Sequence, residues 1–267
     1  MPSTAPIGVF DSGIGGLTVA HELMRQLPAE SLIYFGDTAR VPYGPKSPDT
    51  VRRYSREIAG WLRDEGVKAI VIACNTATAH GLAALRAEMP CPVIGVVEPG
   101  ARAAVNASTG REIGVIGTVG TIRSGAYERA IRELAPDARI AVQPCPLFVP
   151  LVEEGWGSSE AARLVAREYL RPLEEAHVDT VVLGCTHYPL LKPLLADVLG
   201  PRVRLIDSAA ETAAETRRVL AAAGLLASPD NVPTHRFVAS DDPRQFLALG
   251  QRFLGDAIEH VEIRTLG

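Results

Sequence analysis

The sequence of 267 residues has few cysteines, few aromatic residues and no long apolar run. Four cysteines are too few for the disulfide scaffold of a secreted domain, so we expect reduced thiols and a cytoplasmic location. No apolar run approaches the ~18 residues that a membrane-spanning helix needs. Residues 1–6 also lack the basic and apolar regions of a signal peptide. The composition therefore argues against a membrane protein and a secreted protein.

The sequence also lacks the motifs that bind common partners and cofactors. Lys and Arg total 27 against 31 acidic residues, and no basic tract is present that would neutralise nucleic-acid phosphates. Only Lys46, Lys68 and Lys192 could form a Schiff base, and none lies in a phosphate-binding context for pyridoxal phosphate. Residues 11–16 are glycine-rich but have neither the dinucleotide nor the P-loop spacing, and no Cys/His set has zinc spacing. We therefore expect no nucleic-acid partner, no metal and no organic cofactor.

Hydrophobic residues make up 47% of the chain, enough for a sizeable core. Short apolar runs at residues 7–10, 32–35, 69–73 and 92–97 predict strands. Between them, residues 17–27, 49–64 and 77–89 have helical periodicity. Continuously apolar strands that alternate with helices are typical of a parallel sheet covered on both faces, so we predict an α/β fold.

The strand pattern repeats in the second half of the chain. Residues 112–118 resemble 6–12, residues 180–185 resemble 69–74, and residues 202–207 resemble 92–98, each at a spacing of about 110 residues. Three matches in order predict two pseudo-symmetric α/β domains with mainly parallel sheets, although strand-rich strings can also recur by chance. The tail has helical patterns at 209–226 and 243–254 and strand patterns at 234–239 and 261–263.

We expect this tail to pack on the first domain because it lies outside the repeat. The predicted domains are residues 1–98 plus 208–267, and residues 99–207. Glu98 and Asp207 would flank the two crossings between them. A cleft between domains is a common ligand site, so we predict the active site there.

Polar residues follow the predicted strands, where ligands bind in parallel α/β sheets. Unpaired N–H groups at nearby helix starts favour carboxylates or phosphates. The set suits a small zwitterion that carries carboxylates. Its members are Asp11, Ser12, Asp37, Thr38, Cys74, Asn75, Thr76, Glu98, Thr118, Thr121, Cys185, Thr186, His187 and Asp207.

Cys74 and Cys185 occupy matching positions in the two repeats. A thiol at a helix N-terminus has a lowered pKa and exchanges protons near neutral pH. Two such thiols suit the removal of a proton from one face of a carbon and its return on the other. A nucleophilic hydrolase needs only one cysteine with a histidine partner. Cys91 and Cys145, in Pro-Cys-Pro segments, are interpreted as inert core residues that open strands at the far end from the site.

Each of these assignments has a simpler structural alternative. A cysteine after a strand is often only core, Asp11 could cap a helix, and His187 could orient a turn. Glu153 and Glu154 could be an exposed acidic pair. At the level of function, two α/β lobes also suit a non-catalytic amino-acid binder, and a thiol hydrolase or lyase is a third class.

Five segments together resemble the glutamate racemases, members of the aspartate/glutamate racemase superfamily. They are Phe10-Asp-Ser-Gly-Ile-Gly-Gly-Leu-Thr-Val, Pro42-Tyr-Gly, Ala73-Cys-Asn-Thr-Ala-Thr, Phe148-Val-Pro-Leu-Val-Glu-Glu-Gly and Leu183-Gly-Cys-Thr-His-Tyr-Pro-Leu-Leu. The resemblance extends from about residue 7 to 207, with weaker matches in the tail.

The resemblance implies interconversion of L- and D-glutamate without pyridoxal phosphate or metal. It also implies that the D-glutamate enters bacterial peptidoglycan and that the protein is a homodimer. It implies that Cys74 and Cys185 are catalytic, that Asp11 assists the first, and that Glu153 and His187 assist the second. Choosing Glu153 over Glu154 depends on motif alignment. The residues that match substrate-binding groups are Asp11, Ser12, Pro42, Tyr43, Gly44, Asn75, Thr76, Thr118, Thr121, Thr186 and His187.

Overall fold

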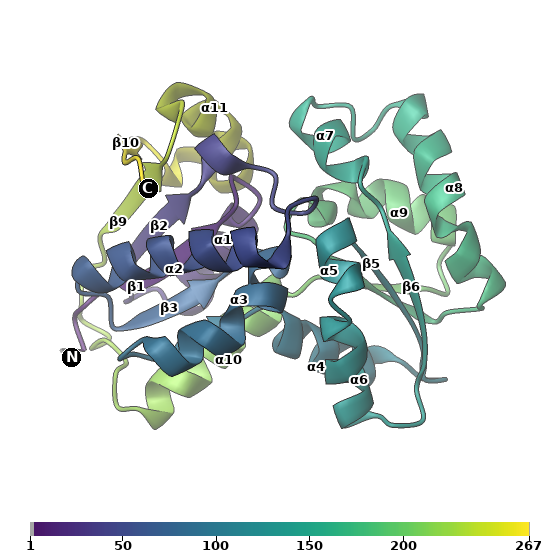
Figure 1. Cartoon of the computed structure of the whole chain (residues 1–267), viewed down its shortest axis with the longest axis horizontal. Coiled ribbons are helices and arrows are strands. Elements are labelled where there is room, and N and C mark those ends of the chain that lie inside the picture. Colours follow the sequence, from purple (N-terminus) through teal and green to yellow (C-terminus); the bar gives the residue numbers. More distant parts are fainter. Residues whose placement is uncertain (1–2, 267) are drawn as a thin grey trace. The chain divides into compact units, whose positions relative to one another are not determined.

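The computed structural model describes residues 3–266, and these form two compact α/β units (Figure 1). The first contains the chain up to Val96 and again from Ala209, and the second is Val97–Ser208. The sequence analysis assigned Met1, Pro2 and Gly267 to the first domain, but these three lie outside the described residues.

The first unit has a six-stranded sheet in the order β10-β9-β2-β1-β3-β4, and every adjacent pair is parallel. Helices cover both faces, as expected for strands that are buried throughout and apolar up to Asp11 at the end of β1. One face packs on α1 (Leu17–Gln26), α10 (Ala209–Ala222) and α11 (Pro243–Leu254), and the other on α2 (Pro48–Asp64) and α3 (Asn75–Glu88). The strands are β1 (Ile7–Asp11), β2 (Leu32–Gly36), β3 (Ala69–Ile72), β4 (Val93–Gly95), β9 (His235–Ala239) and β10 (Glu262–Ile263).

The second unit has a four-stranded parallel sheet in the order β6-β5-β7-β8. Its strands are β5 (Glu112–Gly117), β6 (Arg139–Pro144), β7 (Thr180–Gly184) and β8 (Arg204–Ile206). One face packs on α7 (Phe148–Glu153), α8 (Glu160–Glu175) and α9 (Lys192–Leu199), and the other on α4 (Val97–Ala107) and α6 (Ala126–Leu134). The remaining elements are α5 (Val119–Arg123) and the short 3-10 helices η1 (Thr38–Arg40), η2 (Tyr188–Leu191) and η3 (Gly255–Ala257).

The two sheets share one strand order, because β2-β1-β3-β4 in the first unit matches β6-β5-β7-β8 in the second. The predicted pair of pseudo-symmetric α/β folds with parallel sheets is therefore confirmed. The units differ beside β2, where β9 pairs along the whole strand from Leu32↔His235 to Gly36↔Ala239. The equivalent β6 is an edge strand and is only partly buried. In the first unit, the tail therefore supplies a strand that pairs with β2, so β2 is not an edge strand.

Two predictions about strand ends are wrong. The strand expected at 92–97 ends at Gly95, and α4 begins at Val97. Glu98 therefore lies exposed in the first turn of α4, where a negative charge suits the helix dipole and Pro99 is tolerated. Cys145 does not open a strand at the far end. It follows β6 at the carboxyl end of the sheet, because residues 139–144 pair with β5.

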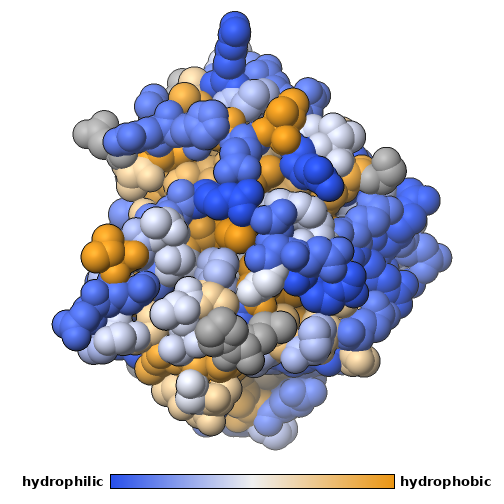
Figure 2. Space-filling model, turned by 90° about the vertical axis from the view of Figure 1, so that its left-hand side faces the viewer, coloured by the Kyte–Doolittle hydropathy of each residue, from blue (hydrophilic) through white to orange (hydrophobic). Residues whose placement is uncertain are grey.

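The face shown in Figure 2 carries hydrophilic residues over most of its area, with small separate hydrophobic groups between them. Singly exposed apolar side chains of this kind are normal on protein surfaces. Within residues 3–266, no helix has both the length and the apolar character needed to cross a bilayer.

Candidate active site

Asp11 is the last residue of β1 and is fully buried. Its Oδ2 accepts the Gly13 N–H at 3.0 Å, which shapes the turn after the strand. The alternative that Asp11 caps a helix is wrong, because the N-cap of α1 is Gly16 and has no side-chain cap. Asp11 therefore belongs to the strand-end turn that the sequence analysis singled out.

Cys74 is the N-cap of α3, two residues after the end of β3, and is 5% exposed. Its Sγ accepts the Ala77 N–H at 3.4 Å and lies 3.8 Å from Ser12 Oγ. An N–H donor and the positive end of a helix dipole both favour the thiolate over the thiol. Asn75 and Thr76 follow in the buried first turn of α3. This end of the sheet can therefore hold a thiol that exchanges a proton.

The loop at residues 42–44 begins with an exposed Pro42, which follows a cis peptide bond, and continues into buried Tyr43 and Gly44. The Tyr43 hydroxyl donates to Asp37 Oδ2. Burial, with the nearby Asp37 charge, raises the pKa of Tyr43 well above its ordinary range, so the hydroxyl keeps its proton. The Tyr43 side chain is therefore an anchor, and only its main chain is available to a ligand. No group that the structure describes accepts the main-chain N–H of Tyr43 or Gly44.

In the second unit, Cys185, Thr186 and His187 follow β7 and are buried. His187 Nε2 lies 2.9 Å from Glu153 Oε1, and its Nδ1 lies 3.9 Å from Cys185 Sγ. The imidazole therefore stands between a carboxylate and the thiol. Glu154, the other member of the acidic pair, is exposed.

The two thiols have different surroundings. Cys74 begins an α-helix, whereas Cys185 lies in a turn before the 3-10 helix η2. The expectation of a thiol at a helix N-terminus therefore applies to Cys74 alone. Near Cys185, the Glu153–His187 pair supplies the polar groups instead.

Thr118 and Thr121 stand at the start of α5, after β5. The Thr118 Oγ1 accepts the Thr121 N–H at 3.2 Å, so Thr118 is the N-cap of this short helix. Both residues thus lie at the carboxyl end of the same sheet as Cys185.

Cys145 also lies at this end of the second sheet, in one apolar cluster with Cys185, Phe148 and Tyr188. Its carbonyl accepts the Tyr188 hydroxyl at 2.8 Å. Burial, and then the nearby Cys185, raise the pKa of the Cys145 thiol, which therefore stays protonated. Burial likewise raises the pKa of Cys91. The expected position of Cys145 is wrong, but its surroundings are those of a core thiol.

The predicted residues thus fall into two groups, one on each sheet. The first unit holds Asp11, Ser12, Pro42, Tyr43, Gly44, Cys74, Asn75 and Thr76, and the second holds Thr118, Thr121, Glu153, Cys185, Thr186 and His187. Among the side chains that the structure describes, no three of His, Cys, Asp or Glu are grouped as metal ligands would be. The sequence analysis missed Ser240, which follows β9 and contacts Asp37. The strand-end rule would have found it if it had been applied to the tail.

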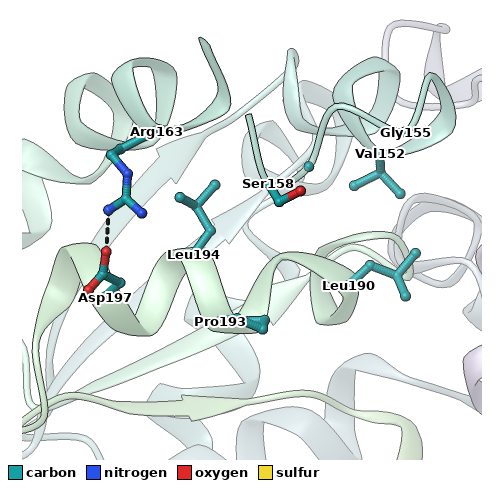
Figure 3. Close-up of a pocket in the computed structure, with 9 residues that line it drawn as sticks. Val152, Gly155, Ser158, Arg163, Leu190, Pro193, Leu194 and Asp197 are labelled. Carbon is teal, nitrogen blue, oxygen red and sulfur yellow. Dashed lines mark hydrogen bonds and ion pairs between the residues drawn. The ribbon is translucent and has the colours of Figure 1, made fainter. Parts of the chain in front are cut away.

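A cavity of about 540 Å³ lies in the second unit but is lined by none of the predicted residues. Figure 3 shows Leu194 and Pro193 on α9, opposite Val152 at α7, with Leu190 at one side. An ion pair between Arg163 and Asp197 lies at the other side. The cavity adjoins α7 and η2, but neither Glu153 at the end of α7 nor His187 before η2 lines it.

Comparisons with known proteins identify the family. The family model for Asp/Glu/Hydantoin racemase matches residues 7–216. The chain belongs to this family.

Within the family, the chain groups with the glutamate racemases. It is 52% identical to the glutamate racemase of Geobacter metallireducens, over 96% of this chain and 94% of that protein. A glutamate racemase of Bacillus anthracis has the same fold, with a TM-score of 0.93 and 42% identity over 99% of this chain and 98% of that chain. The Francisella tularensis glutamate racemase, solved with D-glutamate, gives a TM-score of 0.92 and 40% identity, with 98% of each chain covered. The resemblance found in the motifs is confirmed, and the chain is an amino-acid racemase, which is an isomerase.

Proposed function

We propose that this protein interconverts L-glutamate and D-glutamate without a cofactor, with Cys74 and Cys185 as the two acid–base groups. The observation that carries the proposal is a buried thiol within two residues of the end of each of two equivalent strands, β3 and β7. The sequence relatives at about 51% identity are glutamate racemases, and one solved relative holds D-glutamate. These relationships favour glutamate as the substrate.

In the proposed reaction, one cysteine thiolate takes the proton from the α-carbon, and the C–H electron pair remains on the substrate. The other cysteine, as a thiol, then gives its proton to the opposite face. The protonation states of the two thiols are exchanged at the end, and the reverse reaction uses them in the opposite roles. The mechanism requires both thiols to face one substrate, so each of the predicted domains, 1–98 plus 208–267 and 99–207, supplies one acid–base group.

The neighbours of each thiol support separate assisting roles. We assign Asp11 and Ser12 to the Cys74 side, since Ser12 Oγ lies 3.8 Å from that thiol. We assign Glu153 and His187 to the Cys185 side, since the imidazole lies between the carboxylate and the thiol. Donors that meet a developing negative charge lower the barrier to proton abstraction. We assign this work to main-chain and side-chain donors at residues 12, 42–44, 75–76, 118, 121 and 186–187.

Circular dichroism of L-glutamate and, separately, L-aspartate incubated with the purified protein tests the proposal. With no cofactor added, the glutamate signal should decay to zero and the aspartate signal should persist. Cys74→Ser and Cys185→Ser should each reduce racemisation by at least about 10³-fold, because a serine hydroxyl does not ionise near neutral pH. In D₂O, each single variant should still exchange the α-proton of one enantiomer. Normal racemisation by Cys74→Ser would refute the two-thiol mechanism.

We further propose that the D-glutamate enters peptidoglycan, and that the protein acts as a cytoplasmic homodimer. Depletion of the protein in its host should then make growth depend on supplied D-glutamate. Sedimentation of the purified protein should give twice the mass of 28.4 kDa. Growth without D-glutamate, or a monomeric mass, would contradict the corresponding part.

A further inference from the structure

Asp37 is a fully buried carboxylate at the carboxyl end of β2 that accepts hydrogen bonds from three side chains. Arg40 Nε lies 2.8 Å from Oδ2, and Ser240 Oγ donates to Oδ1 at 2.9 Å. The Tyr43 hydroxyl donates to Oδ2. The Asp37 N–H donates to the Asp11 carbonyl at 3.1 Å, so this group adjoins the turn after β1. A buried charge with this many donors fixes the positions of its partners.

The tail supplies part of this arrangement. Ser240 directly follows β9 and also accepts the Ala39 N–H at 2.9 Å. Thr38 Oγ1 donates to the Asp241 carbonyl at 2.6 Å and accepts the Asp241 N–H at 2.8 Å. The segment after β2 is thus hydrogen-bonded to the segment after β9. We call Asp37, Tyr43 and Ser240 the loop clasp.

The second unit has no equivalent of the loop clasp. The residue that follows β6, the counterpart of β2, is Cys145, and β6 is an edge strand without a neighbour like β9. The clasp therefore depends on the tail, which lies outside the repeat. The second unit has the same strand order without such a clasp, so the clasp is not needed to form this fold.

The clasp acts on the loop at residues 42–44. The Tyr43 ring packs against Tyr54, with 5.7 Å between ring centroids, and Arg40 lies 4.0 Å above the Tyr54 ring. The Tyr43 side chain is thus held at its hydroxyl and at its ring. Its main-chain N–H and that of Gly44 have no acceptor among the described residues. A buried N–H without a protein acceptor is costly unless water or a ligand accepts it.

We propose that Asp37 is a positioning residue that acts through the Tyr43 hydroxyl, and that Ser240 of the tail helps it to aim the N–H groups of Tyr43 and Gly44 at a substrate carboxylate. This rests on the proposed racemase function. Asp37 itself does not touch the substrate. Its loss should therefore weaken substrate binding and leave the proton-transfer step nearly unchanged.

The test measures KM and kcat for L-glutamate, and the unfolding midpoint, in Tyr43→Phe, Asp37→Asn and Ser240→Ala. The control is Glu30→Gln, which changes another buried carboxylate near the opposite end of β2. Glu30 accepts the Ala227 N–H at 2.9 Å and pairs with Lys68, far along the strand from the clasp. Glu30→Gln should lower the midpoint but leave KM within about twofold of wild type.

Tyr43→Phe and Asp37→Asn should each raise KM about tenfold, with kcat within about threefold, since the first removes a hydrogen bond to a charged group and the second removes the charge of its acceptor. Ser240→Ala should raise KM by about threefold. In the double variant of Asp37→Asn and Tyr43→Phe, KM should not exceed the larger single effect by more than about twofold, because both changes break one contact.

A KM of Tyr43→Phe that matches wild type, or additive effects in the double variant, would overturn the inference. If Asp37→Asn does not fold, Tyr43→Phe and Ser240→Ala decide it, since they remove only a hydroxyl. If the wild-type protein racemises glutamate and these variants have the same KM as wild type, only this inference is overturned. A wild-type protein that does not racemise glutamate overturns the proposed function and the inference with it.

Discussion

Gly16→Ala should both destabilise the protein and reduce its activity, because the turn after β1 has no room for a methyl group. An added Cβ would lie 2.5 Å from Asp11 Cβ, 2.8 Å from the Tyr34 hydroxyl and 2.9 Å from Ala73 Cβ. Two of these atoms are first side-chain carbons at strand ends and move only with the main chain. The backbone at Gly16 is helical, with φ −64° and ψ −9°, so alanine meets no torsional strain there and the whole effect is steric.

Overpacking of this kind costs about 1–3 kcal/mol. In a protein of this size that corresponds to a fall in Tm of about 2–12 °C. The clash also displaces Asp11, and a misplacement of about 1 Å can lower kcat/KM by about 100-fold. Thermal unfolding followed by circular dichroism, and racemisation of L-glutamate, measure the two effects.

Gly60→Ala is the matched control. Gly60 lies inside α2, and an added Cβ there meets nothing within 4 Å. Alanine should stabilise this helix by about 0.5–1 kcal/mol and leave activity unchanged. Wild-type Tm and activity in Gly16→Ala, with the expected gain in Gly60→Ala, would refute the steric reasoning.

Two further predictions concern side-chain pairs. Glu153→Gln should lower kcat at least about tenfold, because it removes the carboxylate that lies 2.9 Å from His187 Nε2. Glu154→Gln should have no effect, because Glu154 is exposed. Equal rates in the two variants would contradict the assignment. The hydrogen bond from Arg236 lowers the pKa of Glu262, so this pair stabilises the folded state above the ordinary glutamate pKa and loses its effect as pH falls below it. Arg236→Gln should therefore cost about 1 kcal/mol or less at pH 7, by urea unfolding, and clearly less near pH 3. An equal cost at both pH values would show that packing, and not charge, is responsible.

Much of the fold could be predicted because its signals are local. Continuous apolar runs identified β1, β2 and β3, and the expected helix at 49–64 agrees with α2. The strand order could not be predicted from these runs, because a run of apolar residues does not specify which other strand it pairs with. Glu98 shows the same limit at an element boundary, because the apolar run through Val97 gave no sign that α4 begins there.

The candidate site was predictable where one local rule applied, namely that polar residues after parallel strands gather at one edge. That rule selected Asp11, Cys74, Cys185 and Asp37 before any contact was known. It did not tell a ligand-binding side chain from an anchor. Asp37, which the rule selected as a candidate ligand-binding residue, has its carboxylate bonded to the side chains of Arg40, Tyr43 and Ser240.

By itself the sequence determined the α/β class, the internal repeat and the presence of one thiol after a strand in each half, because periodicity and strand-end chemistry are encoded within a few neighbouring residues. The tertiary structure alone decided three things. It brought the Glu153 carboxylate to His187, because the packing of α7 sets which side of that helix faces the imidazole, and Glu154 lies about 100° further around it. It placed Cys145 beside Cys185, through the pairing of β6 with β5. It joined Ser240 to Asp37 across some two hundred residues, because β9 pairs with β2, and no local pattern specifies which strand will be its neighbour.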